Sequence, residues 1–196
     1  MATIISSLST AQIASLSTAT IRGLSTEDWD AFSTAQIQAL TTAQVAAIPT
    51  LGFSILDTEQ FAAFQTSALR AIGTTAFQTL TTAQLGALES DQIAGLTNNQ
   101  VAAFTTAQLT NLDTDDFRAL TTAQYAAMST RQVAAITTEQ IAAIESQDLA
   151  ALGTAAVRAL TTDQIVALGL DSIAALTATQ DAALTTGQVD AIATAD

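Results

Sequence analysis

The sequence repeats with a period of eight residues, and this period is the feature that most limits the folds open to it. Counted from Met1, residues 1–192 divide into 24 consecutive octads without insertion or deletion, and Ala193 to Asp196 remain. Position 8 is apolar in all 24 octads and position 5 in 23 of them. Position 2 is Thr or Ser in 20, and position 4 is Gln in 14. A period kept this regularly predicts a repeat architecture in which each unit packs against its neighbours.

One short helix per octad is the local structure that fits the pattern. A strand is disfavoured, because Ala and Gln are weak strand formers and the apolar residues do not alternate. One continuous helix is also disfavoured, because the apolar pair would rotate by about 80° with each octad and wind around the axis. A helix followed by a corner in every octad avoids both problems.

The residues at each corner are those that begin helices. In the octad 41–48, Thr41 is placed to be the N-cap residue, and Gln44 three positions later completes a capping box. Pro49 falls at the same corner position of the next octad, as expected because helix interiors reject Pro. We expect each helix to span about positions 2 to 8 and to depend on its neighbours, since so short a helix is unstable alone.

The predicted fold is therefore an all-α solenoid of 24 short helices of about two turns each. We expect a single elongated repeat domain over residues 1–192 and a C-terminal tail over residues 193–196. Positions 4, 5, 7 and 8 share one side of each helix and form the inner face, whereas positions 2, 3 and 6 point outward. The Gln at position 4 borders the core, so its amide needs partners, and the N-cap N–H and the corner carbonyls are the expected ones. The number of octads per coil stays open.

Composition excludes several classes of function. The chain has five Arg, no Lys, no His and no Cys, and its net charge is −13. Disulfides, thiolate chemistry and the commonest metal ligand are absent, and so is the cluster of cations that nucleic-acid binding requires. No apolar run approaches the length of a membrane span. No catalytic or nucleotide-binding motif is present, so we expect no enzyme, no catalytic, cofactor-binding or metal site, and no cofactor.

Four octads depart from the pattern in the same way, because they carry Arg at position 6 and lack Gln at position 4. These arginines are Arg22, Arg70, Arg118 and Arg158. The structural interpretation is that each Arg bonds the corner carbonyls or pairs with an acid on the next coil. The functional interpretation is a ligand-binding stripe. The sequence does not decide their role.

Two further groups of residues allow a structural and a functional interpretation. Large aromatic residues are frequent in the first half of the chain: Trp29, Phe32, Phe53, Phe61, Phe64 and Phe77. We interpret them as core side chains, and the alternative is an aromatic ligand pocket. Tyr125 is read in the same way. The acidic run Asp113 to Asp116 is typical of a helix N-terminus; a calcium site is the alternative, although the run lacks the Gly and terminal Glu of an EF-hand loop.

The two ends of the repeat differ in charge. Residues 1–8 carry no charged side chain, whereas Asp181, Asp190 and Asp196 lie near the C-terminus. We interpret the last octads as a polar cap and the first octad as an open apolar end. Such ends predict head-to-tail self-association, because every octad presents the same apolar pair to its neighbours.

The units LTTAQ-[IV]-x-A-[LI], as in residues 40–48 and 120–128, resemble tandem octad repeats of very large secreted bacterial proteins. That family is often labelled adhesin or haem-utilisation protein, and some members look like type I secretion substrates. The resemblance implies a bacterial cell-surface or extracellular location. The N-terminal residues have no basic start and no long apolar core, so we expect no cleaved N-terminal signal peptide. A haem role is not expected here, because the chain has no His or Cys, and Met1 and Met128 are poor axial ligands. The units also look like the start of a TAL-effector repeat, but the DNA-reading loop and basic residues are missing.

The function that these features favour is a non-enzymatic extracellular spacer, adhesin stalk or self-assembling filament subunit. The main alternative is a module that binds polysaccharide, mineral or ice through a regular Thr, Gln and Ala face. A third hypothesis, mimicry of DNA by an acidic surface, is weakened because the acids are irregularly placed along the octads.

Overall fold

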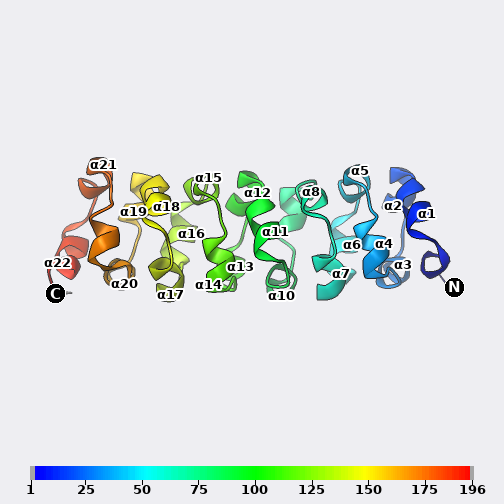
Figure 1. Cartoon of the computed structure of the whole chain (residues 1–196), viewed down its shortest axis with the longest axis horizontal. Helices are drawn as coiled ribbons and strands as arrows, with labels where there is room; N and C mark the ends of the chain where they lie inside the picture. The colour runs from blue at the N-terminus through cyan, green and yellow to red at the C-terminus, as the bar shows by residue number, and fades with distance from the viewer. Residues whose placement is uncertain (1–2, 195–196) are drawn as a thin grey trace. The chain divides into compact units, whose positions relative to one another are not determined.

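The computed structural model describes residues 3–194, and by its internal contacts the chain divides into two units, Met1–Ala103 and Phe104–Asp196. Within the described residues both units are built from short helices joined by corners, without strands (Figure 1). Each unit has the organisation of an α-solenoid, as the period predicts, because its helices contact those that follow three places later.

The first unit begins with a short 3₁₀ helix, and each of its later octads contributes one α-helix. The elements are η1 Ile5–Ser7, α1 Thr10–Ser15, α2 Thr18–Arg22, α3 Thr26–Asp30, α4 Thr34–Gln38, α5 Thr42–Val45, α6 Thr50–Ile55, α7 Thr58–Ala62, α8 Thr66–Leu69, α9 Thr74–Phe77, α10 Thr82–Leu85, α11 Ser90–Gly95 and α12 Asn98–Ala102.

The second unit continues the same pattern. Its helices are α13 Thr106–Thr110, α14 Thr114–Arg118, α15 Thr122–Ala126, α16 Thr130–Ala135, α17 Thr138–Ala142, α18 Ser146–Ala151, α19 Thr154–Arg158, α20 Thr162–Ile173, α21 Ala178–Asp181 and α22 Thr186–Thr194. Helix α20 joins two octads, and Gly169 inside it has non-helical angles of φ 72° and ψ 163°. Helix α22 continues through Ala193 and Thr194, into the residues expected to form a tail.

The helices begin at position 2, as expected, but most end at position 5, 6 or 7, earlier than the expected position 8. Helix α5, for example, covers Thr42 to Val45. The chain has to turn before the next octad, and extended backbone at positions 8 and 1 makes the corner. Leu16 at position 8 has φ −61° and ψ 139°, and Ser17 at position 1 has φ −70° and ψ 153°.

The predicted capping box is confirmed. In octad 41–48 the Thr41 hydroxyl accepts from the Gln44 backbone N–H at 3.3 Å, and Gln44 Oε1 accepts from the Thr41 backbone N–H at 2.7 Å. The same reciprocal pair recurs at most helix starts that have Gln at position 4, as at Thr97 and Gln100. Because each helix has scarcely more than one turn, these caps satisfy a large share of its free N–H groups.

The Nε2 group of the position-4 glutamine joins one coil to the coil before it. Gln44 Nε2 donates to the carbonyls of Ile13 at 2.8 Å and Leu16 at 2.9 Å, which lie 31 and 28 residues earlier. We call the position-4 residues that make such bonds the bridging glutamines. Those with bonds inside one unit are Gln36, Gln44, Gln60, Gln84, Gln92, Gln100, Gln132, Gln140, Gln164, Gln180 and Gln188.

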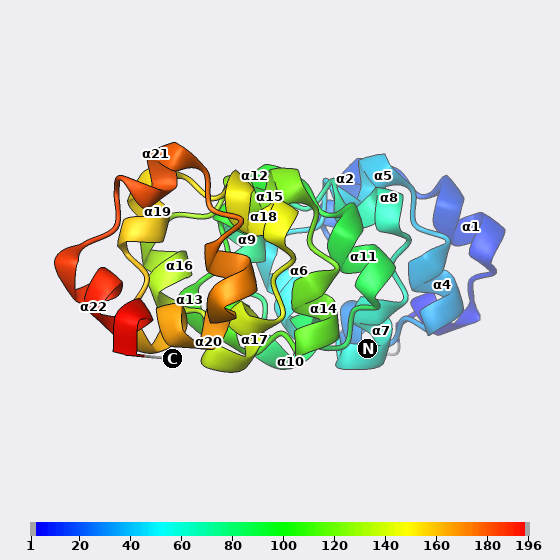
Figure 2. The same cartoon turned by 60° about the vertical axis from the view of Figure 1, so that its left-hand side comes forward.

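The bridging glutamines set the size of the coil within each unit. Their acceptors lie at position 8 and at position 5 or 6 of the octad four places earlier, while helix-to-helix contacts join octads three places apart. A coil therefore takes between three and four octads, about 28 residues. Helices α5 and α8 in the first unit and α14 and α17 in the second lie side by side in this way (Figures 1 and 2).

Burial follows the predicted inner face. In octad 33–40, Gln36, Ile37 and Leu40 are buried, Ala39 is half-buried, and positions 1, 2, 3 and 6 are exposed. Close packing explains the small residue at position 7: a Cβ added to Gly95 would lie 2.0 Å from the Thr66 side chain on the previous coil. The aromatic residues of the first half are buried, so their interpretation as core is confirmed, and Tyr125 is buried too.

Replacing Gln100 with Ala is predicted to lower the free energy of unfolding by about 2–4 kcal/mol. The change removes a cap and leaves the buried carbonyls of Leu69 and Ile72 without their amide donor. Gln12 is the matched control, because its Oε1 also accepts from the N-cap, at Ser9, but its Nε2 makes no hydrogen bond within residues 3–194. Gln12→Ala should cost less than about 1 kcal/mol. Equal losses in urea unfolding followed by circular dichroism would contradict this role.

Candidate functional site

The hydrogen bonds of the bridging glutamines recur along the chain. Octads without Gln at position 4 interrupt them, and a binding site of different chemistry can form at such an octad. Ten octads lack Gln at position 4. Two of these interruptions, at Gly52 and Asp148, border surface hollows, and each lies four octads after an Arg octad.

The hollow at Asp148 has a volume of about 350 Å³ and belongs to the second unit. Its lining residues are Arg118, Leu120, Thr121, Thr122, Glu145, Gln147 and Asp148. Asp148 stands where a bridging glutamine would reach the carbonyls of Phe117 and Leu120, but a carboxylate has no N–H to donate. The side chain is only 8% exposed.

Tyr125 supplies the hydrogen bond that Asp148 cannot. Its hydroxyl donates to the Phe117 carbonyl at 2.6 Å, and its ring packs edge-on against the Phe117 ring, 5.5 Å away. Burial first, and then the negative charges of Asp148 and Glu145, raise the pKa of the Tyr125 phenol, while Arg118 acts in the opposite direction. The only Tyr of the chain is thus fitted to this interruption.

Arg118 pairs with an acid on the next coil, as the structural interpretation of the Arg octads proposed. Its Nη2 lies 3.8 Å from Glu145 Oε1, and both side chains are more than half exposed. An exposed pair of this kind contributes only about 0.2–1 kcal/mol. It orients Arg118 at the rim of the hollow more than it stabilises the fold.

The arginines are spaced differently in the two units. In the first unit Arg22 and Arg70 are 48 residues apart, and in the second Arg118 and Arg158 are 40 residues apart. The first step is six octads, so that α2 and α8 both contact α5, whereas the second step is five octads and is not a multiple of the three that separate contacting helices. The two Arg octads therefore share a row of contacting helices in the first unit but not in the second.

The acidic run Asp113 to Asp116 caps helix α14. The Asp113 side chain accepts from the Asp116 backbone N–H at 2.8 Å, which is the role expected at a helix N-terminus. Within residues 3–194, no group of three or more acidic side chains is arranged to hold a metal ion. In the same part of the chain, no helix combines the length and apolar character that crossing a bilayer requires.

Sequence reasoning identified the Arg octads and the glutamines but missed the interruptions at Gly52 and Asp148. The signal was present, since both positions break the Gln pattern. The proximity of Gly52 to Arg22 and of Asp148 to Arg118 depends on the coil size, because residues about 28 to 31 apart in sequence lie next to each other on successive coils.

Comparison with family models places these features in a wider context. The model of the ALTTAQ repeat matches residues 5–42, 53–90, 61–98, 109–144 and 141–178, which together cover more than half of the chain. The comparison with curated proteins found no match.

Stability should fall above about pH 10, and Tyr125 should be the cause. The chain has no Lys, Cys or His, so Tyr125 is the only side chain with an ordinary pKa near 10. The unfolded phenol loses its proton near that pH while the folded phenol keeps it. The unfolded state then binds fewer protons, and the free energy of unfolding decreases as pH rises.

Tyr125→Phe is the control for this effect. It should cost about 1 kcal/mol near pH 7, because the hydrogen bond to Phe117 is lost, and should abolish the alkaline decrease. Urea unfolding from pH 8 to 11, with phenolate absorbance as a second readout, measures both. A decrease of the same size in Tyr125→Phe would show that another group is responsible.

Proposed function

The chain belongs to the ALTTAQ repeat family, and we propose that it is a non-enzymatic structural protein whose coils stack end to end. The setting we propose is extracellular or at a bacterial cell surface, where such a protein would act as a spacer, adhesin stalk or filament subunit. The observation that supports stacking is the bridging contact, because the first and last coils carry its two complementary halves.

The first coil presents the donor half. Gln12 Oε1 caps its own helix, but its Nε2 makes no hydrogen bond within residues 3–194, and the side chain is exposed. Leu8, Leu16 and Leu24 are only half-buried, whereas position 8 is buried from Phe32 to Leu176. Residues 1–21 contain no charged side chain. This face therefore combines apolar surface with a free amide donor.

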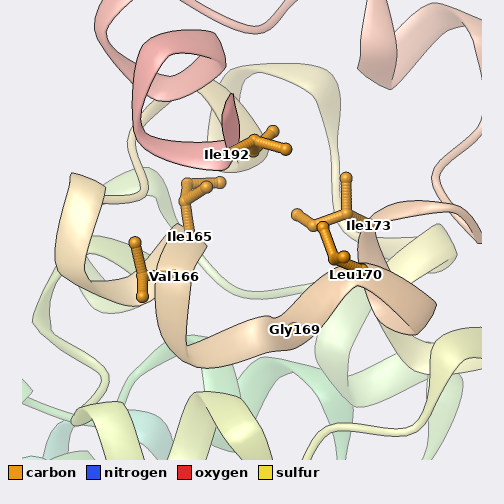
Figure 3. A pocket seen from close by; sticks show the side chains of 6 residues that line it. All are labelled: Ile165, Val166, Gly169, Leu170, Ile173 and Ile192. Atoms are coloured by element: carbon orange, nitrogen blue, oxygen red, sulfur yellow. The ribbon is translucent and has the colours of Figure 1, made fainter. Parts of the chain in front are cut away.

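The last coil presents the acceptor half. Position 5 is buried through most of the chain, but Ile173 is half-buried and Val189 is 49% exposed. An apolar hollow of about 210 Å³ opens here, where the side chains of Ile165, Ile173 and Ile192 face one another around Gly169 (Figure 3). The expected polar cap is thus incomplete, because apolar side chains are exposed beside the aspartates.

The repeat fixes the register of the proposed junction. If a second copy follows the first with the same spacing, its octad 2 lies four places after octad 22 of the first copy. Its Gln12 amide would then donate to the carbonyls of Ile173 and Leu176, as Gln44 donates to those of Ile13 and Leu16. A heterologous contact of this kind does not close and gives open filaments.

Val189→Asp should abolish assembly, because it places a charge in the junction. Gln12→Ala should weaken assembly about tenfold or more, because it removes the hydrogen bonds of the junction. Ala107→Asp, at an exposed outward position, adds the same charge elsewhere and should leave assembly unchanged. Light scattering against protein concentration measures the association. It should strengthen at high salt and near pH 4, where repulsion from the net charge of −13 is reduced.

A monomer at every concentration, salt and pH tested would exclude assembly by end stacking. Filaments that persist in Val189→Asp would instead place the junction on another surface. Surface binding through a regular Thr face is the second candidate, and it has less support because many position-1 hydroxyls, such as that of Thr41, already accept cap hydrogen bonds. Thermal hysteresis at high protein concentration would be its signature for ice.

A further inference from the structure

The two hollows at the interruptions of the bridging contact are built from equivalent positions, 96 residues apart. The hollow of the first unit has a volume of about 250 Å³ and is lined by Arg22, Leu24, Thr26, Trp29, Pro49, Leu51 and Gly52. Adding 96 to these numbers gives Arg118, Leu120, Thr122, Tyr125, Glu145, Gln147 and Asp148, six of which line the hollow of the second unit. We call them the Trp29 hollow and the Asp148 hollow.

In the Trp29 hollow, Gly52 leaves room for the ring of Trp29. A Cβ at residue 52 would lie 2.9 Å from Nε1 and Cε2 of Trp29 and 2.8 Å from Ile48 Cγ2, so no larger residue fits without displacement. The indole nitrogen therefore lies beside the position that a bridging glutamine would occupy. Gly52 is itself buried, because the Trp29 ring and Ile48 occupy the space that a side chain at residue 52 would take.

Trp29 brings a buried donor to this space. The residue is 1% exposed and stacks on Phe32 with ring centroids 5.1 Å apart. Among residues 3–194 the structure gives no hydrogen-bond acceptor to Trp29 Nε1, and no fully buried side-chain nitrogen or oxygen lacks a partner. The Nε1–H therefore keeps a small accessible area although the residue as a whole is 1% exposed, and Trp29 is one of the residues that line the hollow beside Gly52.

Charge distinguishes the two hollows. The Asp148 hollow contains two carboxylates, and one of them, Asp148, occupies the position equivalent to Gly52. The Trp29 hollow has Arg22 at the position of Arg118, but no acidic residue lines it. Its polar groups include two donors, the Arg22 guanidinium and the Trp29 N–H, whereas its other walls are largely apolar, from Leu24, Pro49 and Leu51.

We propose that the Trp29 hollow is a binding site for a carboxylate carried on a short apolar group, such as a small organic acid. The carboxylate would lie within the hollow beside Gly52 and would accept from Arg22 and from Trp29 Nε1. A charge-assisted bond to a guanidinium together with a buried indole donor suits an anion. The apolar walls suit a chain of a few carbons.

Butyrate is the probe, and Trp29 is its reporter because the chain has a single Trp. Titration at constant ionic strength should change the Trp29 emission with saturation and a dissociation constant on the order of 1–10 mM. Butylammonium, which has the same apolar chain and the opposite charge, should give no saturable change. A dilution series without butyrate tests whether a carboxylate of a second copy occupies the site, since emission would then depend on protein concentration.

Arg22→Gln should raise the dissociation constant for butyrate about tenfold or more. Arg70→Gln is the matched control: Arg70 has the same octad position, but the octad four places later has the bridging glutamine Gln100, so the constant should stay within about twofold. The proposal is overturned if butyrate gives no saturable change up to about 100 mM, if butylammonium acts equally, or if Arg22→Gln binds as tightly as the unaltered chain.

Discussion

The glutamine amide at position 4 is the interaction on which the rest of the fold depends. Its oxygen accepts from the N-cap of its own helix and its nitrogen donates to two carbonyls of the previous coil, as Gln100 does with Thr97, Leu69 and Ile72. Helices of four to six residues are not stable alone. One side chain therefore both begins a helix and fixes it to its neighbour, and few other residue types have a donor and an acceptor with this reach.

Much of the fold could be predicted from the sequence, because it is decided locally. The octad period, the Thr41–Gln44 capping box and the buried positions 4, 5 and 8 all depend on residues within one or two octads. The size of the coil could not be predicted in this way. It depends on the angle between successive helices, which the extended residues at positions 8 and 1 set, and a small change per corner adds up over a coil. The bond of 28 residues from Gln44 to Leu16 measures that sum directly.

The individual residues of the candidate site could be predicted from the sequence, but their proximity to one another could not. Arg22 and Arg118 stand out in the sequence, as do the only Trp and the only Tyr. What joins Arg118 to Asp148 is the return of the chain after 30 residues, and the same return joins Arg22 to Gly52. Without the coil size, Gly52 and Asp148 look like scattered defects of the repeat. With it, they fall at equivalent places in the two units, each beside an aromatic residue.

The contacts that replace the missing glutamine at Gly52 and Asp148 are local, because the stability of a solenoid is a sum of contacts between neighbouring repeats. Because each octad contacts mainly those three and four places away, the loss of one glutamine is felt by one neighbouring octad and has to be met there. Tyr125 meets it by donating to the Phe117 carbonyl. At Gly52, Trp29 meets it by filling the space next to the missing side chain. At these two interruptions the amide is thus replaced by different groups. A repeat with this property can acquire sites of different chemistry one octad at a time, while the bridging glutamines on either side keep the coil in register.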